Sequence, residues 1–243
     1  MEDTPLIQNQ LLSALSKADY QHLGPNLKRV TVSLGEVLHP AEKEIKYVYF
    51  PETCVVSIVA SMEDGWTSEI GIVGREGMLG IRVLLGVKKT PHAAVVQVAG
   101  SAMRMPSNLL RQKITVVGNS LSTLLLPYTQ ALLTQLSQSV ACVARHSISQ
   151  RLARWLLAMR DRTGSEKLIL THEIISYMMG VRRSSISVAL GELETAGLIT
   201  GGRGRMTIID TQGLERIACE CYRVVKEEFD QLYKIRPVAQ LDS

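Results

Sequence analysis

Cysteine is scarce in this 243-residue sequence, and its four cysteines do not form a familiar metal or disulfide motif. They are Cys54, Cys142, Cys219 and Cys221, and no two of them make a C-x-x-C pair. Cys219 and Cys221 are closer in sequence than the usual ligand pairs of a tetrahedral zinc site. We therefore expect four buried or unreactive thiols and no metal site, with a redox sensor at Cys54 or Cys142 as the alternative.

No segment has the pattern of a membrane span or a secretory leader. The longest uncharged stretch, Ile114 to Ala144, is interrupted by Asn, Gln, Ser, Thr and Pro127. It therefore lacks the run of roughly 20 apolar residues that spanning requires. The first ten residues, MEDTPLIQNQ, are acidic and polar where a signal peptide is basic and then apolar. The sequence predicts a soluble, cytoplasmic protein with no membrane partner.

Positive charge is concentrated in one part of the chain. The formal net charge is only +4, yet residues 145–205 carry 10 basic and 5 acidic side chains. A local excess of this kind is typical of a surface that binds phosphates. A solvated basic face would have the same composition, so the motifs must distinguish the two.

Residues 1–118 are predicted to form an antiparallel β-roll, or jelly roll. Segments such as KRVTVSL, IKYVYFP, CVVSIVASM and SEIGIVG are rich in β-branched residues, and Gly or Pro interrupts them at regular spacing. Short helices are expected over about Gln8 to Tyr20 and from Ser107 to Ile114. Because helical segments follow these strands, the whole chain is predicted to be α+β.

A long helix is predicted over residues 119–146. Near-heptad spacing places one apolar seam along it: Leu121, Leu125, Tyr128, Leu132, Leu136, Val140 and Val143. We expect this seam to contact both the β-roll and a second copy of the chain, which makes a homodimer. The alternative is a helix buried within its own domain. Pro127 is expected to kink the helix or to lie in its first turn.

Residues 147–243 are predicted to form a DNA-binding domain around a helix-turn-helix. Thr171 is a good helix cap, Gly180 allows a sharp turn, and a second helix follows from about Arg183 to Ala196. Small side chains on the exposed face of this helix would let it enter the major groove. A solvated helical hairpin explains the apolar positions equally well. It does not explain arginines at the helix start, where the dipole disfavours cations unless an anion is near.

The expected DNA contacts come from the second helix and from a wing after it. The segment LITGGRGRMTII is predicted to form two short strands around a glycine-rich tip that contacts the phosphate backbone. Arginines reach guanine edges or phosphates, and serine hydroxyls bond to either. The candidate DNA-binding residues are Thr171, Arg182, Arg183, Ser184, Ser185, Ser187, Val188, Arg203 and Arg205.

In the order of its parts, the chain resembles the Crp/Fnr superfamily of bacterial transcription regulators. The segments that carry the resemblance are SISQRLARWLL, LTHEIISYMMGVRRSSISVALGELETAGLI and the wing. The resemblance implies a homodimer that binds an inverted repeat of double-stranded DNA and, in an activator, contacts RNA polymerase. It also implies that Arg183, Ser184 and Val188 lie at base-reading positions. Arg183 matches the family's arginine, whereas Ser184 and Val188 depart from its common glutamate and arginine, so a different DNA sequence is expected.

The resemblance further implies a cyclic-nucleotide-type pocket, but the family's ligand-binding residues are missing. Ile81 stands where the ribose-binding glutamate is expected, and Pro91-His92-Ala93 stand near the usual Arg-Ser pair. Binding of cAMP by the usual motif is therefore not expected. The basic residues of this region either bind a phosphate in another geometry or lie on a surface loop. The candidate effector residues are Gly80, Ile81, Arg82, Lys88, Lys89 and His92.

Other cofactors and functions are less well supported. The family's iron–sulfur cluster needs an amino-terminal cysteine cluster, and no cysteine precedes Cys54. A haem needs an axial ligand, for which His39 and His92 are available, although a lone histidine is more often structural. A cupin-type metal enzyme would show converging histidines and carboxylates, and no such spacing or catalytic motif stands out. A non-specific architectural DNA binder would have no use for the β-roll.

Overall fold

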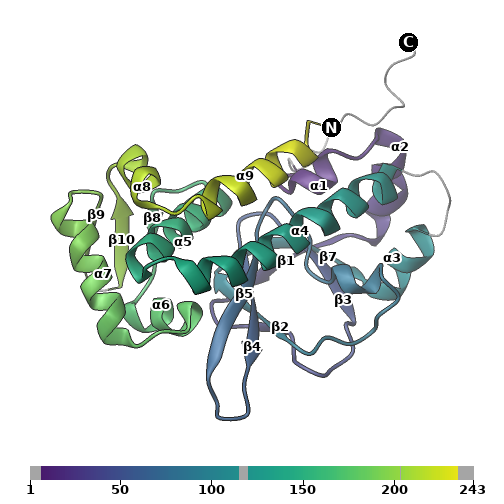
Figure 1. Cartoon of the computed structure of the whole chain (residues 1–243). Helices are drawn as coiled ribbons and strands as arrows, with labels where there is room; N and C mark the ends of the chain where they lie inside the picture. The colour runs from purple at the N-terminus through teal and green to yellow at the C-terminus, as the bar shows by residue number, and fades with distance from the viewer. Residues whose placement is uncertain (1–6, 115–119, 203, 235–243) are drawn as a thin grey trace.

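The computed structural model describes residues 7–114, 120–202 and 204–234. An antiparallel β-roll, a long helix and a helical carboxyl-terminal region follow one another along the chain (Figure 1). The roll consists of a β1-β7-β3 sheet and a β2-β6-β4-β5 sheet, as predicted. Its strands are β1 (Lys28–Val32), β2 (Val37–His39), β3 (Tyr47–Pro51), β4 (Val55–Ser61), β5 (Thr67–Val73), β6 (Ala93–Val98) and β7 (Gly100–Pro106).

The helices that flank the roll differ slightly from the predicted ones. The single amino-terminal helix expected from the sequence is two short helices, α1 (Gln10–Ser13) and α2 (Lys17–Leu23). The side chain of Ser16 accepts a hydrogen bond from the Asp19 amide, so it caps a new helix and ends the old one. The 3-10 turns η1 (Gly24–Asn26) and η2 (Ile81–Val83) lie between strands or before them. Helix α3 (Ser107–Ile114) has the predicted bounds.

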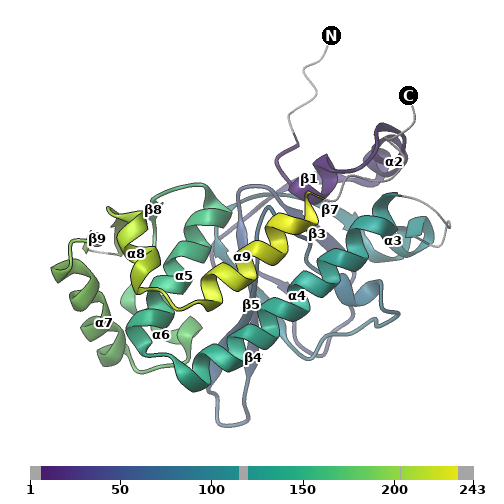
Figure 2. The ribbon, with the colours of Figure 1, turned by 45° about the horizontal axis from the view of Figure 1, so that its top comes forward.

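Helix α4 (Ser120–Arg145) runs across the β-roll, and α9 (Cys221–Leu232) lies beside it (Figures 1 and 2). The Tyr128 hydroxyl of α4 donates a hydrogen bond to the Met78 carbonyl at 2.9 Å, and its ring packs against Phe229 of α9. Pro127 lies within the helix, beyond its first turn. The long helix is therefore held on one side by the roll and on another by the carboxyl-terminal helix.

This packing corrects part of the predicted dimer seam. The side chains of Leu121, Leu125, Tyr128 and Leu132 are buried in the core of their own chain, so they cannot also contact a second copy. Leu136 is partly buried against the same core. Near-heptad spacing identifies an apolar face but does not say what covers it, and here the chain itself covers most of it.

The carboxyl-terminal region forms a winged helix-turn-helix. Helix α5 (Ile148–Thr163) begins at a capping box made by Ser147 and Gln150 and ends at Gly164, which is left-handed. The two helices and the two wing strands follow in the predicted order, and strand β8 and helix α8 are additional to the prediction. They are β8 (Lys167–Leu168), α6 (His172–Met179), α7 (Arg183–Thr195), β9 (Ile199–Gly202), β10 (Arg205–Ile208) and α8 (Thr211–Ile217). No helix in the described ranges has the length and apolar character needed to cross a membrane.

Candidate nucleic-acid interface and its connection to the β-roll

Two helices and a tight turn hold the candidate DNA-reading surface. The Thr171 hydroxyl accepts a hydrogen bond from the Ile174 amide at 3.1 Å and starts α6. Gly180 ends α6 with φ of 60°, a conformation that favours glycine. The Ser176 hydroxyl then donates to the Val181 carbonyl at 2.7 Å and fixes the turn. Both predictions, the cap at Thr171 and the turn at Gly180, are confirmed.

Helix α7 has one buried face and one exposed face. Ile186, Ala189, Leu190 and Leu193 are buried in the core of the domain. Because these residues recur at helical spacing, the opposite face points to solvent. That face carries the predicted DNA-binding residues of the helix, with Ser185 half-buried at its edge. Its exposed residues are Arg182, Arg183, Ser184, Ser187 and Val188.

The arginines at the start of α7 have no acidic partner among the described residues. Arg182 is the N-cap residue and makes no side-chain capping bond, so the first turn of the helix presents backbone amides and two cations together. Ser187 is less available, because its hydroxyl donates to the Arg183 carbonyl at 3.2 Å and lies 3.0 Å from His172 Nδ1. The amino-terminal end of α7 thus presents positive charge and hydrogen-bond donors, which together bind anions.

A β wing lies beside this helix. Strands β9 and β10 pair antiparallel, from Ile208 with Ile199 to Arg205 with Gly202, and β8 pairs with the outer side of β10. Arg205 is exposed at the wing, and Thr171 lies next to Gly204. Arg203, the other predicted wing contact, lies outside the described residues. A second helix with two arginines at its start and one exposed face, followed by a β wing, is typical of the winged helix-turn-helix class of DNA-binding domain.

Comparison with known proteins gives the family of this domain. Residues 150–217 match the family of Crp-like helix-turn-helix domains. No curated protein sequence matches the chain. The match shows that the chain carries a Crp-like helix-turn-helix domain, which supports the role of a DNA-binding transcription regulator.

Solved structures share the whole fold. FixK2 from Bradyrhizobium japonicum is 18% identical, with a TM-score of 0.68 over 79% of this chain and 98% of its own. A transcriptional regulator of the CRP/FNR family from Thermus thermophilus is 21% identical, with a TM-score of 0.62 over 79% and 98%. The c-di-GMP responsive global regulator CLP from Xanthomonas campestris is 13% identical, with a TM-score of 0.63 over 79% and 99%. At these identities the likeness establishes the fold.

A cavity of about 170 Å³ lies between the β-roll and α4. Four of the predicted effector residues line it: Gly80, Ile81, Arg82 and His92. Lys88 and Lys89 do not line it and are exposed, which agrees with the alternative of a surface loop. The remaining lining is mostly aliphatic, and no carboxylate belongs to it.

Two of the polar side chains that line the cavity already bond to backbone carbonyls of the chain. Arg82 Nε donates to the Lys89 carbonyl at 3.2 Å. His39 Nε2 lies 2.8 Å from the Tyr47 carbonyl, and burial lowers the pKa of His39, so its neutral form is favoured. The sequence indicated the loop residues but not the contribution of α4, which adds Thr129, Leu132, Leu133 and Leu136 to the lining.

Strands β4 and β5 connect the cavity to the DNA-binding domain. Their register shifts between Ile58 and Val59, which leaves Ile70 as an extra residue. Ile58 and Ile70 consequently line the cavity, while Val59 and Ile72 pack in the core of the helix-turn-helix domain. The same two strands therefore line the cavity on one face and pack against the DNA-binding domain on the other.

The turn of the helix-turn-helix rests directly on β5. A Cβ atom added to Gly180 would lie 3.0 Å from Ser68 Oγ and 3.5 Å from Trp66 Nε1. Helix α6 packs along the same strand. Since the first residue of α7 follows this turn closely, movement of β5 would move the start of the candidate recognition helix.

Glu69 of β5 is a buried carboxyl at this contact. It accepts hydrogen bonds from the Ser57 hydroxyl and from Trp155 Nε1, the latter at 2.9 Å. Burial raises the pKa of Glu69 to about 7, although these bonds and the charges of Arg154 and Arg162 oppose the increase. The sequence alone did not indicate this residue, because its partner on α5 is 86 positions away.

A pH dependence of stability follows from Glu69. In the unfolded chain a glutamate has a pKa of about 4.3, so the folded state holds the extra proton between that value and about 7. The contribution of Glu69 to the stability of the folded state is complete below the pKa that it has in the unfolded chain. It is lost as the pH rises through the pKa that it has in the folded chain. We expect the Tm of the wild-type protein to fall between about pH 5 and about pH 7 more steeply than that of Glu69→Gln. Equal slopes in thermal unfolding of the two proteins would contradict this assignment.

Proposed function

We propose that this regulator binds an inverted-repeat DNA site as a homodimer, with α7 in the major groove and the wing on the phosphate backbone. The observation that carries the proposal is the exposed face of α7, where Arg182 and Arg183 have no acidic partner in the described ranges while the opposite face anchors the helix. Phosphates or guanine edges would accept charge-assisted hydrogen bonds from these arginines.

An exposed stripe on α4 supports the dimer. Leu126, Leu133 and Val140 recur every seventh residue and are 68%, 51% and 74% exposed. Such large apolar side chains at heptad spacing are the pattern that a second helix covers. The stripe, defined by these three residues, lies on the face of α4 that the β-roll and α9 leave uncovered. As the proposed dimer surface it takes the place of the predicted seam, with which it shares only Val140.

The cavity supports control by a small, largely apolar molecule. A site for a drug-sized ligand usually measures about 300–1,000 Å³, which is larger than this one. A cyclic nucleotide would need partners for its phosphate and ribose, and Ile81 supplies an aliphatic side chain where a carboxylate would serve. We do not propose a haem, because a porphyrin is larger than this cavity and His39, one of the two candidate axial ligands, has its Nε2 directed at a backbone carbonyl.

A ligand in the cavity would act on the proposed dimer stripe of α4 and on the strand that supports the helix-turn-helix. Leu133 belongs to the cavity lining and to the exposed stripe, and Ile70 belongs to the strand that supports α6. An occupant that displaced either residue would change the spacing of two recognition helices, which must lie about 34 Å apart to meet one face of DNA. The protein would act in the cytoplasm without catalysis, and RNA polymerase would be a further partner if it activates.

A cyclic nucleotide is therefore expected not to stabilise the protein. A ligand that binds only the folded state at 100 times its Kd stabilises by about 2.7 kcal/mol, which raises the Tm by several degrees. We expect cAMP at about 1 mM to leave the Tm unchanged in thermal unfolding, because no carboxylate lines the cavity and the Nε of its one arginine is bonded to a backbone carbonyl. An upward shift of several degrees would overturn the proposal of an apolar effector.

Selection of bound DNA from a random pool tests the proposed function. Purified wild-type protein at moderate salt is expected to enrich an inverted repeat whose half-sites lie about one helical turn apart. Enrichment of a single, unrepeated motif would contradict the dimer. Salt-sensitive binding with no enriched motif, with and without an extract of small molecules from the host cell, would favour the architectural alternative.

A further inference from the structure

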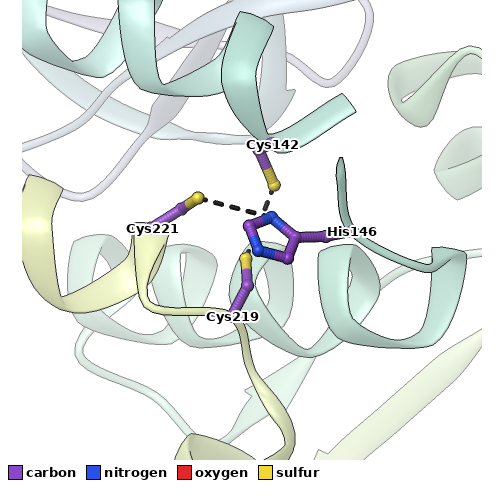
Figure 3. A group of neighbouring side chains, drawn as sticks. All are labelled: Cys142, His146, Cys219 and Cys221. Carbon is purple, nitrogen blue, oxygen red and sulfur yellow. Dashed lines mark hydrogen bonds between the residues drawn. The ribbon is translucent and has the colours of Figure 1, made fainter. Parts of the chain in front are cut away.

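Four side chains that can bind metal come together where α4 ends and α9 begins. They are Cys142, His146, Cys219 and Cys221, and all point into one small space (Figure 3). Their ligand atoms lie within 4.8 Å of one another. This group, the thiol–imidazole cluster, contains three of the four cysteines of the chain.

The distances within the thiol–imidazole cluster approach those of a metal tetrahedron. Cys142 Sγ lies 3.5 Å from Cys219 Sγ, and Cys221 Sγ lies 3.6 Å from His146 Nδ1. With zinc–sulfur bonds of about 2.3 Å and zinc–nitrogen bonds of about 2.0 Å, a tetrahedron has S–S edges of about 3.8 Å and S–N edges of about 3.5 Å. The side chains therefore need only small rotations to surround an ion.

His146 is held in the orientation that a metal ligand needs. Its Nε2 lies 3.1 Å from Glu220 Oε2, which leaves Nδ1 directed at the thiols. A carboxylate on the far nitrogen of a histidine fixes the tautomer and increases the basicity of the ligating nitrogen. Gln138 adds a second outer contact, since its Nε2 donates to Cys221 Sγ at 3.2 Å.

The cluster is also enclosed. Cys142, Cys219 and Cys221 are 0%, 4% and 1% exposed, and the His146 side chain is 15% exposed. A closed site with four protein ligands is typical of structural zinc, whereas a catalytic ion keeps an open position. Three thiolates and one imidazole suit zinc better than magnesium or calcium, which prefer oxygen ligands.

We propose that Cys142, His146, Cys219 and Cys221 bind one structural Zn²⁺ ion per chain. The ion would join the last turn of α4 to the segment between α8 and α9. Helix α9 continues from this segment along α4 into the core of the β-roll, where Phe229 and Leu232 are buried. Zinc would thus hold the DNA-binding domain in a fixed position relative to the β-roll and the proposed dimer surface.

The spacing of the four ligands along the sequence did not indicate this site. Cys219 and Cys221 enclose a single residue. The other two ligands are Cys142, in the last turn of α4 and 77 positions before Cys219, and His146, the residue after the end of α4. The expectation of no metal site rested on the sequence spacing of the cysteines, no two of which form a C-x-x-C pair. Packing of α9 against α4 supplies the second pair, and sequence patterns do not reveal that packing.

Elemental analysis of the full-length protein tests the proposal. Protein purified under reducing conditions without chelator is expected to hold about one zinc per chain, and protein stripped of metal is expected to regain that amount. Replacement by cobalt is expected to give the thiolate charge-transfer absorption of three Co–S bonds. Cys219→Ser is expected to lose the zinc, whereas Cys54→Ser, which alters the buried cysteine outside the cluster, is expected to retain it.

The wild-type measurement decides the question even if a cluster variant fails to fold. Stripped wild-type protein that takes up no zinc overturns the proposal, as does a Cys142–Cys219 disulfide found by mass spectrometry in protein as isolated. Iron with acid-labile sulfide in place of zinc also overturns it. Zinc that remains stoichiometric in folded Cys219→Ser assigns the ion to other residues.

Discussion

Replacement of both Leu126 and Val140 with glutamate is expected to convert the proposed dimer to monomers and to weaken binding to an inverted repeat by about 10²–10⁴-fold. The two residues lie two heptads apart on α4 and are the most exposed members of the stripe. In a dimer, their carboxylates would be buried in an apolar contact without partners, which is costly. Sedimentation velocity measures the oligomeric state, and fluorescence anisotropy with the selected duplex measures the affinity.

The fold of the monomer should be unaffected by this double substitution, because both positions face solvent within a single chain. Leu34→Glu is the matched control: its side chain is 51% exposed, and it lies in the turn between β1 and β2, outside α4 and the helix-turn-helix domain. The control is expected to remain dimeric and to bind DNA normally. A double variant that stays dimeric would remove the stripe from the account and place the dimer contact elsewhere.

Arg183→Ala is expected to cost about 1–3 kcal/mol of specific binding, which is about 5- to 150-fold in affinity. Arg183 is the first residue of α7, is exposed and has no acidic partner in the described part of the chain, so it is placed to contact a guanine edge. Its loss should relax the sequence preference at one base pair of each half-site. Repeating the selection with the variant would show that relaxation directly.

Arg205→Ala on the wing provides the contrast. Arg205 is exposed on β10, and we expect it to contact phosphate, so its loss should weaken binding to all sequences alike and reduce the salt slope by about 1. If Arg183→Ala also weakens binding uniformly, with the motif unchanged, Arg183 is a phosphate contact and base reading must come from other residues of α7.

Local signals predicted the DNA-binding domain well. Ser147, Thr171, Gly164 and Gly180 determine where its helices begin and end through hydrogen bonds and backbone angles within a few residues. The paired strands of the wing likewise follow from a glycine-rich turn. Such features are visible in sequence because the residues that make them are close along the chain.

Contacts between distant segments were not predictable in the same way. The apolar pattern of α4 predicted a long helix but not which partner covers each of its faces. Tyr128, for example, packs on Phe229, which lies 101 positions later in the sequence. Glu69 meets Trp155 only because the DNA-binding domain lies on β5. The thiol–imidazole cluster depends on the same long-range packing of α9.

The number of chains on the selected DNA tests the central claim most directly. Sedimentation equilibrium of the protein with a duplex that carries one selected site should show two chains per duplex, and this number should not change when non-specific flanks are added. One chain per duplex would contradict the homodimer. A number that increases with the length of the duplex would contradict sequence-specific binding by α7.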